Sequence, residues 1–545
     1  MQPTVPDLRG RIINGIEWGA ALGILVLLVV LHVVVLFHAG PLWRDEITSL
    51  NVVSQPSWAA MFKSNACDSF PSLWHIFLRA WIGLGLGGTL LLLRLSGLLV
   101  GLGIVAALWW AARTFNVRVP LLALVLFALN SSVLVYGDAV RAYGFATLLM
   151  LLTLGAVWRM VQKPTPLRTV TAAVLAILSV HANYPNSVLL ATMFVGVVAA
   201  GLYCRTWRPA LYLLVIGLLA ALSMLLYLPT FASIREWNMI VKNPMSVADL
   251  FGRFSQALIP KDGLGLVLWA LLVLVALGLC LHRLRRPLPN SSVHDRALPV
   301  FILTLIIAAS LAFLLYLKYL SVTTQPWYYL PIIGLLAVLI DAAVCLPAQT
   351  NLLLRAARLF LVLVLGGLSL LPVWRSVHLR ATTMDLLAAE LHARADKDDF
   401  IVVMPFYLAT SFAHYYHGPA SWMTVPPLET DFRIQPYRLY KDKMTQSDPL
   451  RPLLQKIYAT LESGHKVWLV GDCQFVRPGE VPGYLPPAPS EQAGWQEVPY
   501  SFVWSRQTCF AVQNHARTIR LFTAKPDGPV RIDYEDVSVF FMAEP

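Results

Sequence analysis

Charged residues are scarce in this sequence. Only 13% of it is Asp, Glu, Lys or Arg, whereas an ordinary soluble domain has about 25%, and 57% is hydrophobic. The apolar residues come in long blocks, without the alternation of a half-buried strand. Blocks such as 15–37 and 300–317 are long enough to cross about 30 Å of hydrocarbon as helices. Because lipid offers no partners to an open backbone, they predict a polytopic α-helical membrane protein and exclude a soluble one.

Motifs of several common chemistries are also missing. The six cysteines are scattered, with no CxxC pair and no zinc spacing. The polar C-terminal region has no GxGxxG or GxxxxGKS phosphate loop. Cys473 and Cys509 fall in that region, and they either pair in an oxidising compartment or remain two buried thiols. The net charge of +12 predicts no nucleic-acid partner, because the basic residues of a membrane protein are concentrated in its cytoplasmic loops, and their position matters more than their surplus.

Hydropathy predicts about eleven transmembrane helices. We expect the first to be retained, because its apolar stretch is longer than the core of a cleaved signal. The segment 168–181 is the weakest, being short and followed closely by Pro185. The expected spans are 14–38, 88–112, 119–136, 141–160, 168–181, 186–204, 209–228, 263–282, 298–318, 327–346 and 355–373.

Basic residues sort the connections between these spans into two sets. Short basic connections such as 113–118 and 282–296 indicate the cytoplasmic side, where Lys and Arg are enriched. The other set mixes acidic, aromatic and basic residues, and it comprises 39–87, 137–140, 229–262 and the C-terminal region. We therefore expect a cytoplasmic N-terminus and an extracytoplasmic C-terminal domain.

The composition changes at about residue 381 to that of a water-exposed domain. We therefore divide the chain into a membrane domain, 1–380, and a C-terminal domain, 381–545. An alternation of helices and strands in the second part predicts an α/β layer with a parallel component. The expected elements are a helix over 382–395, a strand over 400–404, a helix over 448–463 and a strand over 466–470.

The first extracytoplasmic loop holds two adjacent carboxylates, Asp45 and Glu46, beside Trp43 and close to a membrane exit. A carboxylate held at the membrane surface can serve as a general base or a metal ligand. The alternative is ordinary solvated loop charge. Downstream, Asp68 and His75 lie in or beside a stretch that is apolar but poorly suited to span, which is typical of an interfacial helix.

Further ionisable groups recur on the same expected side of the membrane. Arg94 lies within an apolar run, where a charge either faces a polar partner or snorkels to the interface. Asp138 and Arg141 are three residues apart at a helix start, and a simple i,i+3 pair is the alternative to a functional role. His181 and Tyr184 occupy the next outside turn, although a lone His is more often structural. The recurrence of ionisable and polar groups in successive turns on one side of the membrane indicates a site at this face.

Four short motifs follow one another in the chain: Trp43-x-Asp45-Glu46, Phe70-Pro71-Ser72-Leu73-Trp74-His75, Arg94-Leu95-Ser96 and Arg141-x-Tyr143. In this order they resemble the GT-C superfamily of membrane glycosyltransferases, and most closely the bacterial branch related to protein O-mannosyltransferases and the lipid A aminoarabinose transferase. The resemblance covers about 15–230, and 325–331 is similar to a late segment of that branch. Ser72 departs from it where the family often has a second proline, which affects only local helix geometry.

The resemblance implies a GT-C-like inner-membrane enzyme with a polyprenyl-phosphate sugar donor and an inverting single displacement. Asp45 would take the proton from the acceptor hydroxyl, with Glu46 orienting it or binding a metal. A divalent metal stays open, because no ligand set in the sequence is specific enough. The departing lipid phosphate needs cationic or hydrogen-bonding groups, for which the candidates are Arg141, Tyr143, Arg94 and His181. The candidates for other substrate contacts are Asp138, His75, Arg235, Trp237 and Tyr184.

Several alternatives remain open at this stage. The loop 229–262 covers the site in similar enzymes, but its bases could instead grip phospholipid headgroups. The acceptor could be an envelope glycolipid such as lipid A, a glycan or a protein. A transporter or flippase for a lipid-linked or anionic substrate would also suit many spans and a cationic set, although the charges lie mostly at the span ends. A non-catalytic envelope assembly protein is the third class.

Overall fold

The computed structural model describes residues 8–65, 68, 70–258, 264–286, 293–348, 351–525 and 528–545. Contacts within the chain divide it into two compact units, which we call the membrane unit and the sheet unit. The membrane unit comprises Met1–His38, Phe70–Tyr227 and Pro244–His378. The sheet unit comprises Ala39–Ser69, Leu228–Asn243 and Leu379–Pro545.

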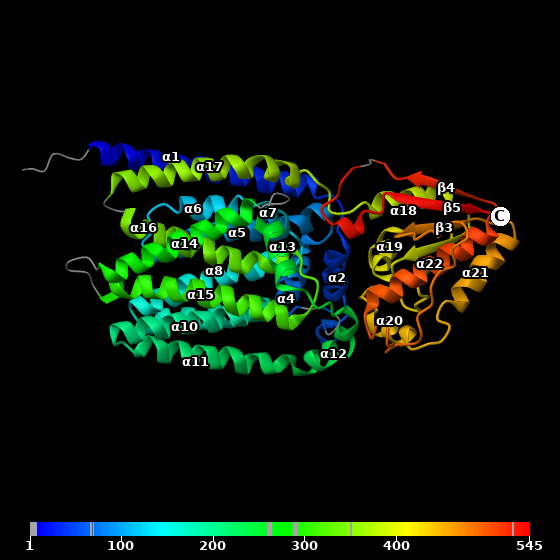
Figure 1. The fold of residues 1–545 in the computed structure, drawn as a ribbon, viewed down its shortest axis with the longest axis horizontal. Helices are drawn as coiled ribbons and strands as arrows, with labels where there is room; N and C mark the ends of the chain where they lie inside the picture. Colours follow the sequence, from blue (N-terminus) through cyan, green and yellow to red (C-terminus); the bar gives the residue numbers. More distant parts are fainter. Residues whose placement is uncertain are drawn as a thin grey trace, which may run out of the picture. The chain divides into compact units, whose positions relative to one another are not determined.

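The membrane unit is a bundle of long apolar helices, and within it α1 and α17 lie side by side (Figure 1). Among the described residues, nine helices are long and apolar enough to cross a membrane. Their bounds are α1 (Leu8–His38), α5 (Leu90–Thr114), α8 (Ala142–Gln162), α10 (Asn186–Cys204), α11 (Arg208–Ser223) with η4 (Met224–Tyr227), α14 (Leu264–Arg285), α15 (Val293–Leu320), α16 (Leu330–Ala348) and α17 (Leu352–Val377).

Two further segments complete the predicted set. The short span expected over 168–181 is α9 (Pro166–Ala182), a helix of 17 residues. The span expected over 119–136 is helical but broken, and it consists of α6 (Leu121–Ala123), η3 (Leu124–Ala128) and α7 (Ser131–Gly137). The prediction of a polytopic helical membrane protein is confirmed. Of the eleven predicted spans, nine correspond to described helices long enough to cross a membrane, whereas the fifth is a shorter helix and the third is not one continuous helix.

The break in that segment has a clear chemical basis at Asn130. Its Oδ1 accepts the backbone N–H groups of Ser132 and Val133, which replaces the missing helical bonds at the start of α7. Its amide nitrogen donates to the carbonyls of Ala257 and Leu258 in α13 (Val247–Leu258). Because Asn130 is itself buried in protein, an interrupted backbone is tolerated here.

A buried ion network joins α1, α16 and α17 within the membrane unit. Asp341 of α16 lies 2.8 Å from Nη2 of Arg358, and Glu17 of α1 lies 2.6 Å from Nη2 of Arg355. Arg358 also donates to the carbonyl of Val119, so the network includes the chain just before α6. Sequence analysis did not single out Asp341 or Glu17. Their direct pairing with the two arginines offsets the cost of burying charge among apolar helices.

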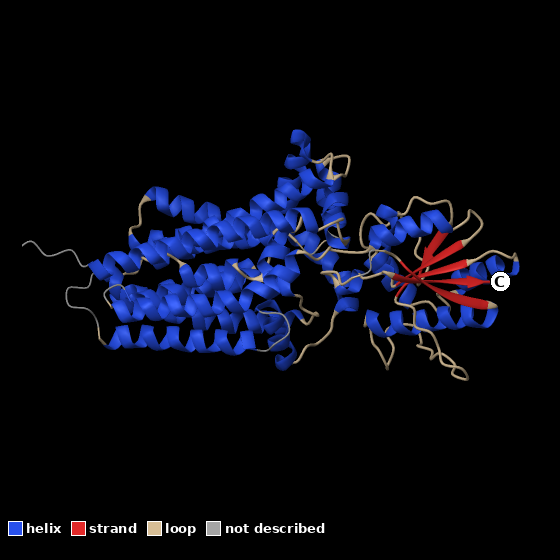
Figure 2. Ribbon diagram, turned by 90° about the horizontal axis from the view of Figure 1, so that it is seen from above, coloured by secondary structure: helices blue, strands red, loops and turns tan. Residues whose placement is uncertain are grey.

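The sheet unit is built on five strands in the order β2-β1-β3-β5-β4. The pairs β1–β2 and β1–β3 are parallel, whereas β3–β5 and β4–β5 are antiparallel. Figure 2 shows the strands fanned by their twist, with helices on both faces of the sheet. The strands are β1 (Phe400–Met404), β2 (Ser421–Thr424), β3 (Val467–Gly471), β4 (Thr518–Thr523) and β5 (Val539–Glu544).

Alternating side chains of β1 explain the two layers of helices. Val402 and Met404 enter the hydrophobic cluster formed with the helices of one face, and Ile401 and Val403 enter the cluster of the other face. The first face is covered by α20 (Tyr437–Met444), α21 (Arg451–Glu462) and α22 (Glu497–His515), and the second by α18 (Met384–Arg394) and α19 (Ala409–Tyr415). The predicted α/β domain with a parallel component is confirmed.

Two segments that the predicted boundary at 380 assigned to the membrane domain belong instead to the sheet unit, together with the C-terminal residues. The first contains α2 (Arg44–Val53) and α3 (Trp58–Ser64), and the second contains α12 (Leu228–Asn238) and η5 (Met239–Val241). The backbone N–H of Ala381 donates to the carbonyl of Ala39 at 2.8 Å. Residues 259–262 of the expected outer loop lie outside the described residues.

Candidate functional site

The carboxylate pair predicted to carry the chemistry stands at the start of α2. Trp43 is the N-cap residue, so Asp45 and Glu46 are the second and third residues of the helix. Glu46 is fully buried, and its Oε2 accepts the Trp43 backbone N–H at 3.3 Å, which is the half of a capping box that does not require an N-cap acceptor. The structure thus places Glu46 where it fixes the first turn of α2, and with it the backbone that carries Asp45.

Arg44 holds the Asp45 side chain in one orientation. Its Nε lies 3.0 Å from Oδ1 of Asp45. The guanidinium carbon lies 5.3 Å from the ring centroid of Tyr407 and 4.9 Å from that of Tyr534, within the range of cation–π contacts. The Asp45 side chain nevertheless remains 16% exposed. An oriented carboxylate that is still accessible suits a group that must meet a substrate hydroxyl.

A third carboxylate, Glu535, reaches the same helix start from the C-terminal end of the chain. It follows Asp533 and Tyr534 in η8 (Asp533–Glu535). Its Oε1 accepts the backbone N–H of Arg44 at 3.0 Å and the hydroxyl of Ser411 at 2.8 Å. The side chain is fully buried, and this burial raises the pKa of Glu535 from 4.5 to about 7, although Arg44 and the Ser411 hydroxyl oppose the rise.

In the membrane unit, the predicted phosphate-binding residues Arg141 and Tyr143 share an aromatic cluster. The Arg141 guanidinium lies over the ring of Phe70, 4.8 Å from its centroid. Tyr143 meets Phe70 edge to face at 5.3 Å and stacks on Trp327 at 5.3 Å. Trp327 belongs to η6 (Pro326–Tyr329), within the segment 325–331 that the sequence also singled out. The four side chains thus bring together three motifs that are far apart in the chain.

Asp138 lies against α5 and contacts a residue that sequence analysis passed over. Its Oδ2 lies 2.8 Å from Nδ1 of His32 on α1, and both side chains are buried. The turn approaches α5 closely because Gly97 and Gly101 have no side chain there, and a Cβ at either would overlap an oxygen of Asp138. Arg94, on the same helix α5, is also buried.

His181 belongs to a hydrogen-bond chain that is complete without a ligand. The Ser72 backbone N–H donates to the Tyr227 hydroxyl at 3.2 Å, and that hydroxyl lies 2.9 Å from Nδ1 of His181. The other ring nitrogen, Nε2, lies 2.9 Å from Oγ of Ser223, which donates onward to the carbonyl of Ala220. Donors and acceptors match when the imidazole is neutral, so this geometry favours a structural role over phosphate binding.

The remaining predicted residues divide between the two units. His75 is buried on α4 (Leu73–Trp81) of the membrane unit, and Tyr184 meets the Tyr227 ring edge to face. In the sheet unit, Trp237 of α12 stacks on Tyr437 of α20 with centroids 4.7 Å apart, whereas Arg235 is exposed. Trp237 therefore packs its segment onto the C-terminal domain.

Metal ligands do not cluster in the part of the chain that the structure describes. No group of three or more His, Cys, Asp or Glu side chains there could hold an ion. Cys473 and Cys509 are free thiols, and a hydrogen bond with Cys509, together with burial, raises the pKa of Cys473. The divalent metal left open by the sequence gains no ligand set from these residues.

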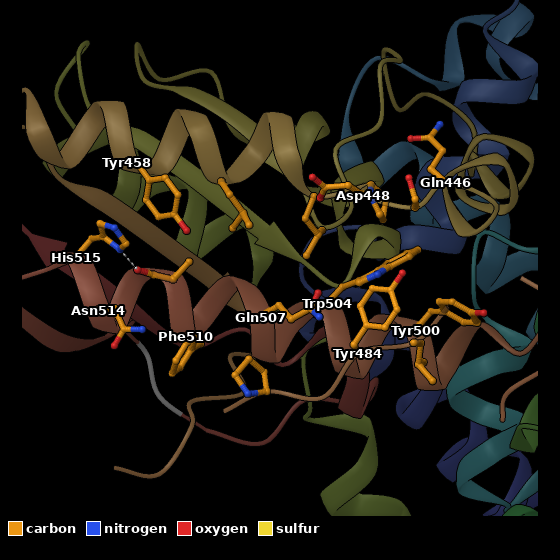
Figure 3. A pocket seen from close by; sticks show the side chains of 17 residues that line it. Gln446, Asp448, Tyr458, Tyr484, Tyr500, Trp504, Gln507, Phe510, Asn514 and His515 are labelled. Carbon is orange, nitrogen blue, oxygen red and sulfur yellow. Dashed lines mark hydrogen bonds between the residues drawn. The ribbon is translucent and has the colours of Figure 1, made fainter. Parts of the chain in front are cut away.

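The sheet unit also contains a pocket of about 390 Å³ between α21, α22 and the chain around Tyr484 (Figure 3). Tyr458 of α21 lines one side, and Trp504 and Gln507 of α22 line the other. The lining contains no Lys or Arg, and Asp448 adds a negative charge. Because Asp448 lines it and the only basic side chain in its lining is His515, this pocket suits the phosphate end of a lipid-linked donor poorly.

Sequence analysis missed two of the residues that shape these groups. His32 is an ionisable residue inside the first apolar span, and this position alone was a usable signal because such residues are rare and often functional. Glu535 gave no signal, because it lies 491 residues from Arg44 in a segment without a motif.

No known protein family and no curated protein matches the chain. Among solved structures, it is similar to ArnT from Cupriavidus metallidurans bound to undecaprenyl phosphate, with 15% identity over 83% of this chain and 93% of that chain and a TM-score of 0.48. It is also similar to the oligosaccharyltransferase of Archaeoglobus fulgidus in the apo form, with 9% identity over 94% of this chain and 75% of that chain and a TM-score of 0.49. The chain is an integral membrane protein of many helices with a C-terminal α/β domain.

Proposed function

We propose that this protein is an inverting glycosyltransferase that moves a sugar from a polyprenyl-phosphate donor to an envelope acceptor. The observation that carries the proposal is the Asp45 carboxylate, which Arg44 orients at 3.0 Å while its side chain stays 16% exposed. Asp45 accepts the proton of the acceptor hydroxyl as the oxygen attacks the anomeric carbon from the face opposite the lipid phosphate. One displacement of this kind inverts the configuration at that carbon.

The departing phosphate requires positive charge that is already in place, because a site that excludes water has no solvent to reorient around the developing negative charge. Arg141 and Arg94 are two buried cations of the membrane unit with the chemistry for this task. The packing of Arg141 on Phe70, 4.8 Å from the ring centroid, holds its guanidinium in one orientation. Tyr143 adds a hydroxyl from the same cluster.

The acceptor hydroxyl belongs to an envelope glycolipid, a glycan or a protein. The site is placed at the extracytoplasmic face of the inner membrane, with the N-terminus cytoplasmic. This orientation rests on the basic connections and on an odd number of spans. Labelling of a single cysteine introduced at Arg285 tests it, since reaction with an impermeant reagent from outside would invert the proposed topology.

The decisive experiment follows the release of free polyprenyl phosphate from a panel of polyprenyl-phosphate sugars, with envelope lipid extract as acceptor. Purified wild type and Asp45→Asn are assayed side by side. Release by the wild type alone identifies the reaction, the sugar and the base together. Equal release by both proteins removes Asp45 from the mechanism. Movement of an unchanged substrate across proteoliposomes, without release, would favour a transporter or flippase instead.

A further inference from the structure

The start of α2 is tied to the C-terminal domain by three hydrogen bonds within the sheet unit. The Ala39 carbonyl accepts the N–H of Ala381, and the Leu42 carbonyl accepts the Tyr415 hydroxyl at 2.8 Å. The third bond, from the Arg44 N–H to Glu535, is the one nearest to Asp45. It is also the only one of the three that involves a charged or titratable carboxyl group.

We propose that Glu535, acting through the backbone N–H of Arg44, is a positioning residue for the Asp45 carboxylate. This inference rests on the proposed function, in which Asp45 is the base. The first N–H groups of a helix have no partner within the helix, and a carboxyl oxygen is a strong acceptor for them. Glu535 thereby fixes the residue whose side chain in turn holds Asp45.

The surroundings of Glu535 support a role beyond packing. Ser411 donates to the same oxygen, Oε1, so this atom is held from two sides. The second oxygen, Oε2, is buried and has no hydrogen-bond partner among the described residues. A carboxyl group kept in this half-satisfied state costs stability. A role of Glu535 in aligning α2 for the reaction accounts for a buried carboxyl group at this position.

The Arg44 guanidinium completes the connection. It is held by the rings of Tyr407 and Tyr534, and Tyr534 immediately precedes Glu535 in the chain. The backbone of Arg44 and its side chain are therefore fixed by neighbouring residues of η8. A displacement of η8 would move both contacts together, and a shift of about 1 Å at a catalytic group can cost on the order of 100-fold in rate.

The test compares Glu535→Ala with Glu535→Gln, which keeps an oxygen acceptor for Arg44 and Ser411. Amide hydrogen exchange over 42–50 is measured together with the release of polyprenyl phosphate. In Glu535→Ala we expect exchange at Arg44 to rise at least about fivefold and kcat to fall roughly 10- to 100-fold, with donor KM within about twofold. In Glu535→Gln both stay within about threefold of wild type.

Two further variants separate positioning from general damage. In the Asp45→Asn background, Glu535→Ala should cause no additional loss of turnover, because the two changes act on one group. Ser411→Ala removes one of the two bonds to Glu535 and should shift exchange and kcat in the same direction by about two- to fivefold, which serves if Glu535→Ala fails to fold. Glu480→Ala, which breaks an exposed pair with Arg506, is the matched control and should change neither quantity.

The outcomes distinguish this inference from the proposed function. Faster exchange with unchanged kcat in Glu535→Ala overturns the positioning role and leaves the transferase standing. Equal losses in the Gln and Ala variants would show that an acceptor at Arg44 is not what matters, and this too overturns it. If the wild type releases nothing from any donor while exchange still rises, the proposed function falls together with the base, and only a structural anchor is left.

Discussion

Two buried charge clusters, one in the membrane unit and one in the sheet unit, are built in different ways. In the ion network of α1, α16 and α17, both carboxylates contact a guanidinium directly: Asp341 contacts Arg358 at 2.8 Å, and Glu17 contacts Arg355 at 2.6 Å. Every charge is compensated by its neighbour, so the network has little capacity to interact with anything else. Such a cluster joins helices and stabilises the bundle.

The cluster of the sheet unit is compensated only in part. Glu535 accepts neutral donors, the Arg44 backbone and the Ser411 hydroxyl, while the Arg44 guanidinium pairs with Asp45 instead. Asp45 remains partly exposed. Complete pairing therefore marks a structural cluster, and incomplete pairing with access to solvent marks the one that we propose for catalysis.

The sharpest way to test this comparison is Asp45→Asn. The amide keeps the size of the side chain and an oxygen for Arg44 but cannot take a proton. We expect turnover to fall by about 10²–10⁴-fold, the range for loss of a general base, with donor binding and unfolding midpoint unchanged. Asp431→Asn, in an exposed pair with Arg433, is the control and should retain full activity. A stability loss in Asp45→Asn would place it with the structural cluster instead.

Asp341→Ala is the corresponding change in the membrane unit, and it should act on stability. It leaves Arg358 buried without its carboxylate, a change that typically costs about 3–5 kcal/mol. We expect a strongly reduced yield of folded protein and a lower thermal midpoint, with kcat of the surviving fraction near that of wild type. Replacing both Asp341 and Arg358 by Leu should recover much of the midpoint. Failure of that double variant to recover would mean that the pair does more than join helices.

The pH dependence of stability sharpens the comparison further. Since burial raises the pKa of Glu535 from 4.5 to about 7, the folded protein keeps a proton that the unfolded chain releases between these values. The proton on Glu535 contributes fully to stability below pH 4.5. As the pH rises from 4.5 to 7, the free energy of unfolding should fall by about 3 kcal/mol. Burial also raises the pKa of Glu497 to about 7, so Glu535→Gln should remove only part of the fall in the midpoint measured from pH 5 to 8. An identical fall in wild type and variant would contradict the raised pKa of Glu535.

The smallest effect is expected from Arg141→Lys. Lysine keeps the charge but not the planar group that lies over Phe70, a contact worth about 1 kcal/mol. We expect kcat/KM for the donor to fall about three- to tenfold, with no change in the thermal midpoint. Arg438→Lys, in an exposed pair with Glu236, is the matched control. A marked fall in the thermal midpoint with little change in kcat/KM would show that Arg141 has a structural role instead.

Long apolar runs made the membrane fold predictable, because the bilayer imposes both helix and length. β1 and β3 were equally clear, being apolar on both faces. The remaining strands were not, since β4 has largely exposed side chains and β2 has only four residues. The break at Asn130 was also invisible, because it depends on two carbonyls of α13, more than 120 residues away.

For the site, short motifs indicated residues but not their partners. Arg141, Tyr143 and the segment 325–331 were each singled out, and the structure joins them through Phe70 and Trp327. The sequence could not tell that Glu46 would cap its own helix or that His181 would be satisfied by Tyr227 and Ser223. Those facts depend on tertiary contacts, which carry no local pattern.

The separation of Arg44 and Glu535 by 491 residues has a consequence for the time course of synthesis. At about 5–20 residues per second, α2 leaves the ribosome roughly 25–100 s before the residue that anchors it. Until η8 is made, the nascent chain carries the proposed base on a helix that lacks the contact nearest to Asp45. The order of synthesis therefore sets when α2 gains this contact, and a chain cut short before η8 would lack it.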